Sequence, residues 1–196
     1  MLSELLNTDF RPLDRKACDL YLSAVEQVRP AQLALPTPCA DWTLHGLLRH
    51  QVSQDEGFAA AARGEGGRLS HWRNGDLGAD HVAAAKTSAE FVTAAFAEAS
   101  LDQEFILPEV REGGGFPAAL AISFHFVDLV VHAWDVATAI GAPWEPSEEL
   151  LTASLKVAAI VPDDGRGPGA SFDKPVASAP GDAPGRRLLS LLGRTP

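Results

Sequence analysis

Four polar side chains recur within one apolar stretch, residues 117–141: His125, Asp128, His132 and Asp135. With about 100° per residue in an α-helix, the four fall within an arc of roughly 80°. Most other side chains around these turns are apolar, so we expect this helix to be buried. A buried carboxylate beside two imidazoles must be paired, protonated or bound to a cation. The stripe is therefore where this sequence is most able to do chemistry.

Asp128 and His132 are four residues apart, so their side chains project from one face of the helix, one turn apart. A carboxylate oxygen and an imidazole nitrogen can then reach the same ion at about 2.1 Å. His50 is the best candidate for a further ligand, because it lies early in a second helical pattern, at the edge of its apolar stripe. A purely structural Asp–His hydrogen bond, with no metal, is the alternative that spacing alone leaves open.

The elements that must position these residues are helical. Apolar spacing, caps and breakers predict helices over residues 13–28, 44–64, 79–100, 117–141, 147–160 and 185–194. Residues 101–115 are irregular, with room for a short extended piece, and nothing alternates long enough for a larger sheet. We predict an all-α, four-helix bundle with extra short helices and a C-terminal strap. The chain is interpreted as one domain, 1–196, with a core of about 10–162 and a tail, 163–196, packed on it.

The charge composition limits the classes of partner that the protein can bind. The 196 residues include 16 Lys and Arg against 26 Asp and Glu, a net charge of −10, so nucleic acid and anionic membrane surfaces are disfavoured. The apolar stretch is long enough to span a bilayer, but its two His and two Asp make a buried helix of a soluble protein the better interpretation. Cys18 and Cys39 cannot build a disulfide framework, and the N-terminus does not read as a signal peptide, so we expect a cytoplasmic protein.

Two segments resemble a known family. The run PTPCADWTLHGLLRHQ, with Thr37-Pro38-Cys39, Trp42, Leu47 and His50, resembles the opening signature of the mycothiol-dependent maleylpyruvate isomerase N-terminal family. That family is a branch of the DinB/YfiT-like bundles of actinobacteria. The run DLVVHAWDVATAIG resembles its second signature, in which a carboxylate precedes His by four residues and Trp-Asp follows. The ending looks like the tail of a subgroup described only as metal-binding proteins, so the resemblance covers nearly the whole chain.

The resemblance implies a metal triad of His50, Asp128 and His132, holding zinc or another divalent metal such as nickel. Two nitrogens and one carboxylate leave positions open for water or substrate. In the characterised relatives the metal activates a low-molecular-weight thiol as its thiolate. The partners implied are a thiol such as mycothiol and an electrophilic substrate.

The sequence also departs from the family pattern. Asp128 stands where the isomerases usually have Glu, and their second α+β domain, which supplies a catalytic arginine, does not follow here. We therefore expect a reaction other than maleylpyruvate isomerisation. His125 is the candidate catalytic residue, as a general base, with roles as a fourth ligand or a hydrogen-bonding group in the pocket as alternatives. Asp135 is expected behind the ligands or in helix packing.

The leading hypothesis is a metal- and thiol-dependent transferase or isomerase-like enzyme. The competing hypothesis is a non-catalytic module, in which the metal and pocket bind a small ligand or stabilise a homodimer. An enzyme needs an open position on the metal, whereas a structural site would be closed by a fourth protein ligand such as His125.

Overall fold

The computed structural model describes residues 2–39, 42–162, 166–167 and 172–196. Its long elements are four helices: α2 (Arg11–Val25), α3 (Leu44–Ala62), α4 (His81–Glu98) and α5 (Ala118–Ile140). The shorter elements are α1 (Leu2–Leu6), η1 (Pro30–Gln32), η2 (Leu69–Trp72), β1 (Glu104–Ile106), β2 (Gly115–Pro117), α6 (Glu148–Ala158) and α7 (Pro184–Leu191). The predicted all-α bundle of four main helices with additions is confirmed.

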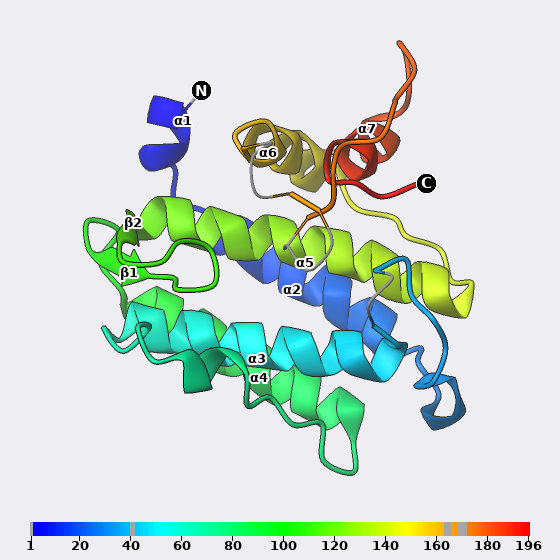
Figure 1. Cartoon of the computed structure of the whole chain (residues 1–196), viewed down its shortest axis with the longest axis horizontal. Coiled ribbons are helices and arrows are strands. Elements are labelled where there is room, and N and C mark those ends of the chain that lie inside the picture. The colour runs from blue at the N-terminus through cyan, green and yellow to red at the C-terminus, as the bar shows by residue number, and fades with distance from the viewer. Residues whose placement is uncertain (1, 40–41, 163–165, 168–171) are drawn as a thin grey trace.

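The four long helices pack as two layers. In Figure 1, α2 and α5 lie side by side and form one layer, and α3 and α4 lie side by side and form the other. Helix α6 packs on the outer face of α5, and α7 packs against α6. Helix α5 therefore has neighbours on most of its circumference, which explains why its sequence is apolar on nearly every face.

Local sequence signals set the helix ends that matter for the site. The Thr43 side chain accepts a hydrogen bond of 3.3 Å from the backbone of Gly46 and so caps α3, the helix that carries His50. Helix α5 ends at Gly141, whose φ of 70° is the left-handed conformation that glycine adopts at no steric cost. Both ends agree with the sequence prediction.

The short elements α1, η1, η2, β1 and β2 were not predicted individually. Helix α1 has five residues, of which only Leu5 is buried, too little for a periodic signal. In the irregular segment, β1 and β2 pair antiparallel with Phe105 opposite Phe116. This small hairpin is the extended piece that the sequence left room for.

Helix α5 is long and apolar enough to cross a membrane, but 83% of its most apolar window is buried inside the fold. Its neighbours in the bundle therefore already cover it, as expected for the core helix of a soluble protein.

The C-terminal residues turn back onto the bundle after α7. Residues 163–165 and 168–171 of the predicted strap lie outside the described part of the chain. Gly193 has a φ of 80°, and a Cβ there would meet the Asp173 backbone at 2.7 Å, so both the turn and the close approach require glycine. The turn brings Arg194, which is 5% exposed, toward α5.

Candidate metal centre

The structure brings together the three residues predicted to hold a metal. One ligand atom from each of His50, Asp128 and His132 lies within 4.8 Å of the other two. The His132 Nε2 and an Asp128 oxygen are 3.4 Å apart, as the one-turn spacing on α5 predicts. His50 comes from α3, so the group joins two facing helices of the bundle.

The other ring nitrogen of His132, Nδ1, takes part in a hydrogen bond on the side away from Asp128. Its Nδ1–H donates to Asp135 at 3.0 Å, one turn further along α5. This hydrogen bond fixes the ring so that Nε2 faces Asp128. A histidine held through one nitrogen by a carboxylate, with the other free for an ion, is the common arrangement of metal-binding histidines. Asp135 thus has the supporting position that the sequence predicted for it.

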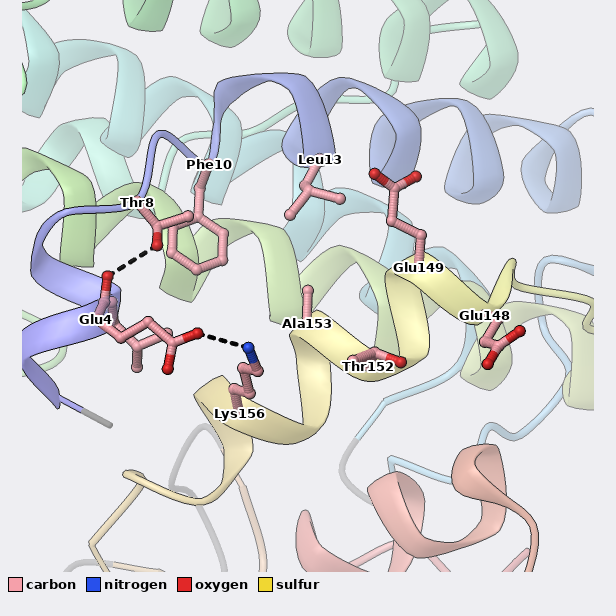
Figure 2. Close-up of a pocket in the computed structure, with 10 residues that line it drawn as sticks. Glu4, Thr8, Phe10, Leu13, Glu148, Glu149, Thr152, Ala153 and Lys156 are labelled. Carbon is pink, nitrogen blue, oxygen red and sulfur yellow. Dashed lines mark hydrogen bonds and ion pairs between the residues drawn. The ribbon is translucent and has the colours of Figure 1, made fainter.

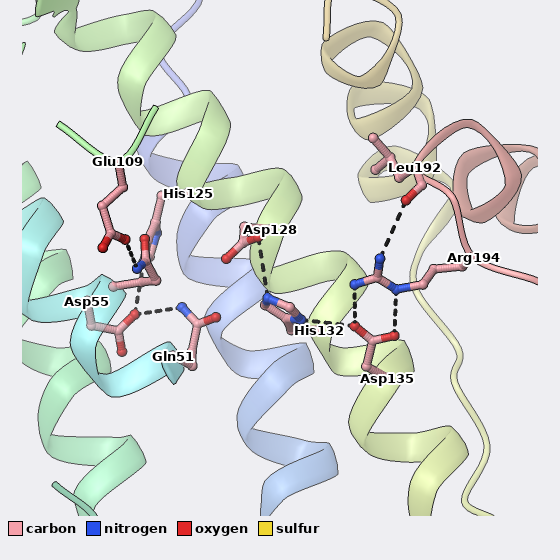
Figure 3. A network of polar contacts seen from close by, with 10 residues as sticks. Gln51, Asp55, Glu109, His125, Asp128, His132, Asp135, Leu192 and Arg194 are labelled. Carbon is pink, nitrogen blue, oxygen red and sulfur yellow. Dashed lines mark hydrogen bonds and ion pairs between the residues drawn. The ribbon is translucent and has the colours of Figure 1, made fainter. Parts of the chain in front are cut away.

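Arg194 completes this arrangement from the far end of the chain. Its Nε and Nη2 donate to the two oxygens of Asp135, each at 2.8 Å (Figure 3). Asp135 is fully buried, so this two-point contact compensates a charge that water cannot reach. Arg194 could not be identified from the sequence, because no spacing rule links residues 59 positions apart. Its place in a short, amphipathic C-terminal helix pattern gave no sign of burial.

An aromatic ring covers the His50 side of the group. Trp42 stacks on the His50 imidazole, with ring centroids 4.3 Å apart and the planes 28° from parallel. The Trp42 ring also lies 6.3 Å from the ring of His132. Trp42 is half-buried and packs against the site.

The two imidazoles have opposite tendencies to bind protons. Burial, followed by the nearby His132, lowers the pKa of His50 to about 4. Burial alone would also lower the pKa of His132, but Asp128 and Asp135 outweigh it and raise that pKa. At neutral pH, His50 therefore offers a free lone pair to a cation.

The donor set fits a divalent transition metal. Two imidazole nitrogens and one carboxylate oxygen suit zinc and its neighbours, and they leave at least one position open in a tetrahedral site. Among the described residues the group has three members. The Asp128 side chain is 16% exposed while His132 is 2% exposed, so the site faces solvent on its Asp128 side.

His125, the candidate catalytic residue, lies elsewhere. Its ring is fully buried, with Nδ1 2.7 Å from Asp14 and Nε2 3.0 Å from Asp55. Although burial alone would lower it, these carboxylates raise the pKa of His125 to about 10. Both nitrogens are engaged as donors, so this geometry does not support His125 as a fourth ligand or a general base.

Asp55 extends this second cluster across the bundle. It accepts hydrogen bonds from Gln51 at 2.9 Å and from Ser88 at 2.6 Å. Together with Asp14 and His125, these residues link all four long helices. The four-residue polar stripe on α5 thus divides between two clusters, and this division could not be predicted without knowing how the helices face one another.

Two cavities lie away from the metal group. The smaller, of about 470 Å³, lies between α6 and the α1–α2 region, where Lys156 and Glu4 form an ion pair of 2.6 Å (Figure 2). The larger, of about 840 Å³, lies between α3 and α4 and includes Phe91 and Arg63 in its lining. None of the three metal-group residues lines either cavity.

Comparison with known proteins finds a family, two relatives and a solved structure that are similar to this chain. Residues 15–137 match the family described as the mycothiol maleylpyruvate isomerase N-terminal domain. Uncharacterized proteins from two strains of Mycobacterium tuberculosis, CDC 1551 / Oshkosh and ATCC 25618 / H37Rv, are each 33% identical over 184 residues, covering 92% of this chain and 95% of theirs. A crystal structure of a histidine-to-alanine mutant of the mycothiol-dependent maleylpyruvate isomerase superposes with a TM-score of 0.57 at 18% identity, over 79% of this chain and 68% of that one. This likeness confirms the DinB-like fold.

Proposed function

Because the chain belongs to the mycothiol maleylpyruvate isomerase N-terminal domain family, we propose that it binds a divalent metal and uses a low-molecular-weight thiol in a transferase or isomerase-like reaction. The observation that carries the proposal is the convergence of His50, Asp128 and His132 within 4.8 Å, with Asp135 behind His132. Zinc is the metal that this donor set favours, with nickel as the alternative.

The ligands and the residues that support them have separate roles in this proposal. His50 supplies a nitrogen that is already neutral, His132 supplies one once the metal displaces its proton, and Asp128 supplies the compensating negative charge. Asp135 then holds His132 in the tautomer that has its Nε2 lone pair free, and Arg194 keeps Asp135 in place. A divalent cation bound there would lower the pKa of a thiol and keep the thiolate populated at neutral pH. Trp42 stacks on His50 and covers one face of its ring.

Mycothiol is the proposed thiol, because both the family and the superposed structure are named for it. The second reactant would be a small electrophile. The protein would work in the cytoplasm, where its two cysteines, which form no disulfide, stay reduced.

One observation favours the second candidate, a non-catalytic metal or small-ligand-binding module. His132 is 2% exposed and Trp42 stacks on the His50 ring, so little of the metal group is open to solvent, whereas an enzyme needs room for a substrate beside its metal. The module would use the same three ligands, and a homodimer is one state that it could stabilise.

Cobalt substitution separates the two candidates. The cobalt-loaded protein should develop a sulfur-to-metal charge-transfer band when mycothiol is added, and Asp128→Ala should lose both the cobalt spectrum and the band. The exposed Asp102→Ala is the control and should behave as wild type. A cobalt spectrum that does not respond to mycothiol would favour the module.

A further inference from the structure

Two buried polar atoms next to the metal group have no hydrogen-bond partner among the described residues: the hydroxyl of Tyr21 and the carboxamide oxygen of Gln51. Both side chains are closed off from solvent, with Tyr21 2% and Gln51 1% exposed. Leaving such groups unpaired costs free energy, so most buried polar atoms find partners. Two of them at one place call for an explanation.

Gln51 lies between the two polar clusters. Its nitrogen donates to Asp55 at 2.9 Å, which fixes the carboxamide and leaves the oxygen turned to the side on which His132 lies (Figure 3). Its neighbour in sequence is His50, one of the three metal-group residues. The unpaired acceptor is thus held rigidly and directed away from Asp55.

Tyr21 approaches the same region from α2. Asp14 of α2 contacts His125 of α5, and the two helices run side by side in the same direction (Figure 1), so Tyr21, two turns after Asp14, lies beside the turns of α5 that carry Asp128 and His132. Burial, and then the charges of Asp55 and Asp128, raise the pKa of Tyr21, so the hydroxyl keeps its proton. A hydrogen-bond donor on α2 and an acceptor on α3 therefore flank the inner side of the metal group.

We propose that Tyr21 and Gln51 recognise the small-molecule thiol of this site, with the Tyr21 O–H donating to its sulfur and the Gln51 oxygen accepting from a hydroxyl or amide N–H close to that sulfur. The inference rests on the proposed function and deepens it. The pair selects thiols that carry a hydrogen-bond donor near the sulfur over thiols that are apolar there. A site that loses a hydrogen bond to an otherwise equal ligand discriminates against that ligand.

Two thiols of nearly equal size test this selectivity: 2-mercaptoethanol, which has the hydroxyl, and 1-propanethiol, which has a methyl group in its place. Each is titrated into the cobalt-loaded protein, and the ratio of the two dissociation constants is compared among variants. We expect Gln51→Met to reduce the preference for 2-mercaptoethanol about tenfold relative to wild type, the effect of one lost hydrogen bond. Tyr21→Phe should weaken the binding of both thiols about equally.

Cobalt affinity should be unchanged in both variants, because neither residue is a ligand. Ser154→Ala is the matched control: it removes another buried hydroxyl, on α6, that has no partner in the described part of the chain, and it should leave both titrations unchanged. Unchanged thiol binding and preference in Tyr21→Phe and Gln51→Met would overturn the inference while leaving the thiol function intact. If mycothiol alters the cobalt spectrum of the wild type but neither small thiol does, the inference fails alone; if mycothiol does not alter it either, the proposed function fails and the inference fails with it.

Discussion

Arg194 donates hydrogen bonds of 2.8 Å to both oxygens of Asp135, a residue 59 positions earlier in the chain. Asp135 in turn binds His132 at 3.0 Å. The C-terminal segment is therefore connected, through one carboxylate, to a residue of the metal group. If the group binds a metal as proposed, we expect this binding to require that the C-terminal residues are folded onto α5.

Replacing Arg194 should weaken the metal site without touching it. Arg194→Met leaves Asp135 buried without its cation, which should cost about 3–5 kcal/mol of stability. Metal affinity should fall roughly 10–100-fold, as is typical when a partner behind a ligand is lost. Competition with a chromophoric zinc chelator measures the affinity. Arg186→Met, an exposed arginine on α7, is the control and should match wild type; equal affinities for the two variants would contradict the connection.

Zinc binding should release about one proton at pH 6. The pKa of His132 is raised above its ordinary value, by Asp128 and Asp135 against the effect of burial, so its ring carries a proton that the metal must displace. The pKa of His50 is about 4, so that ring is already neutral. Calorimetric titrations in buffers of different ionisation enthalpy count the protons. Release of two protons, or of none, would show that the electrostatics of the two rings are misassigned.

His125 should matter for stability and not for metal content. His125→Ala leaves Asp14 and Asp55 buried without the imidazole between them, at a cost of about 3–5 kcal/mol. Urea unfolding measures the loss, and elemental analysis of the folded fraction should find metal as in wild type. His45→Ala, on the exposed side of α3, should be silent in both assays. A variant that kept its stability but lost its metal would contradict this prediction and would show that His125 takes part in metal binding.

The contribution of His125 to the free energy of unfolding should also depend on pH. The pKa of His125 is about 10 in the folded protein and near its ordinary 6.5 when unfolded, so its contribution is complete below pH 6.5. That contribution is lost as the pH rises from 6.5 through 10. The difference in unfolding free energy between wild type and His125→Gln should shrink over this range. A difference that stays constant, or grows with pH, would mean that the imidazole is not held as the cation.

The fold and the metal group could be predicted because their signals are local. The one-turn spacing of Asp128 and His132, the Thr43 cap and the glycine at position 141 each act within a few residues. His50 was predicted from its place on an apolar stripe and from the resemblance to the family. These signals determine which side chains share a helix face, and that was enough to bring the three residues together.

The rest depended on how the helices face one another. On α5 alone, His125 and His132 share a face, and only the packing of α2 and α3 shows that Asp14 and Asp55 bind the first. Arg194 and Tyr21 reach the region from other parts of the chain, so no period or motif points to them. Tertiary partners of this kind could not be predicted from the spacing of residues in one sequence.

The central claim is that His50, Asp128 and His132 hold a divalent metal, and the metal content of the protein tests it most directly. Protein purified without a chelating tag should contain close to one equivalent of zinc or nickel by elemental analysis, and His132→Ala should contain almost none. His45→Ala should retain the full amount. Wild-type protein with less than about a tenth of an equivalent, and no thermal stabilisation when zinc or nickel is added, would contradict the account.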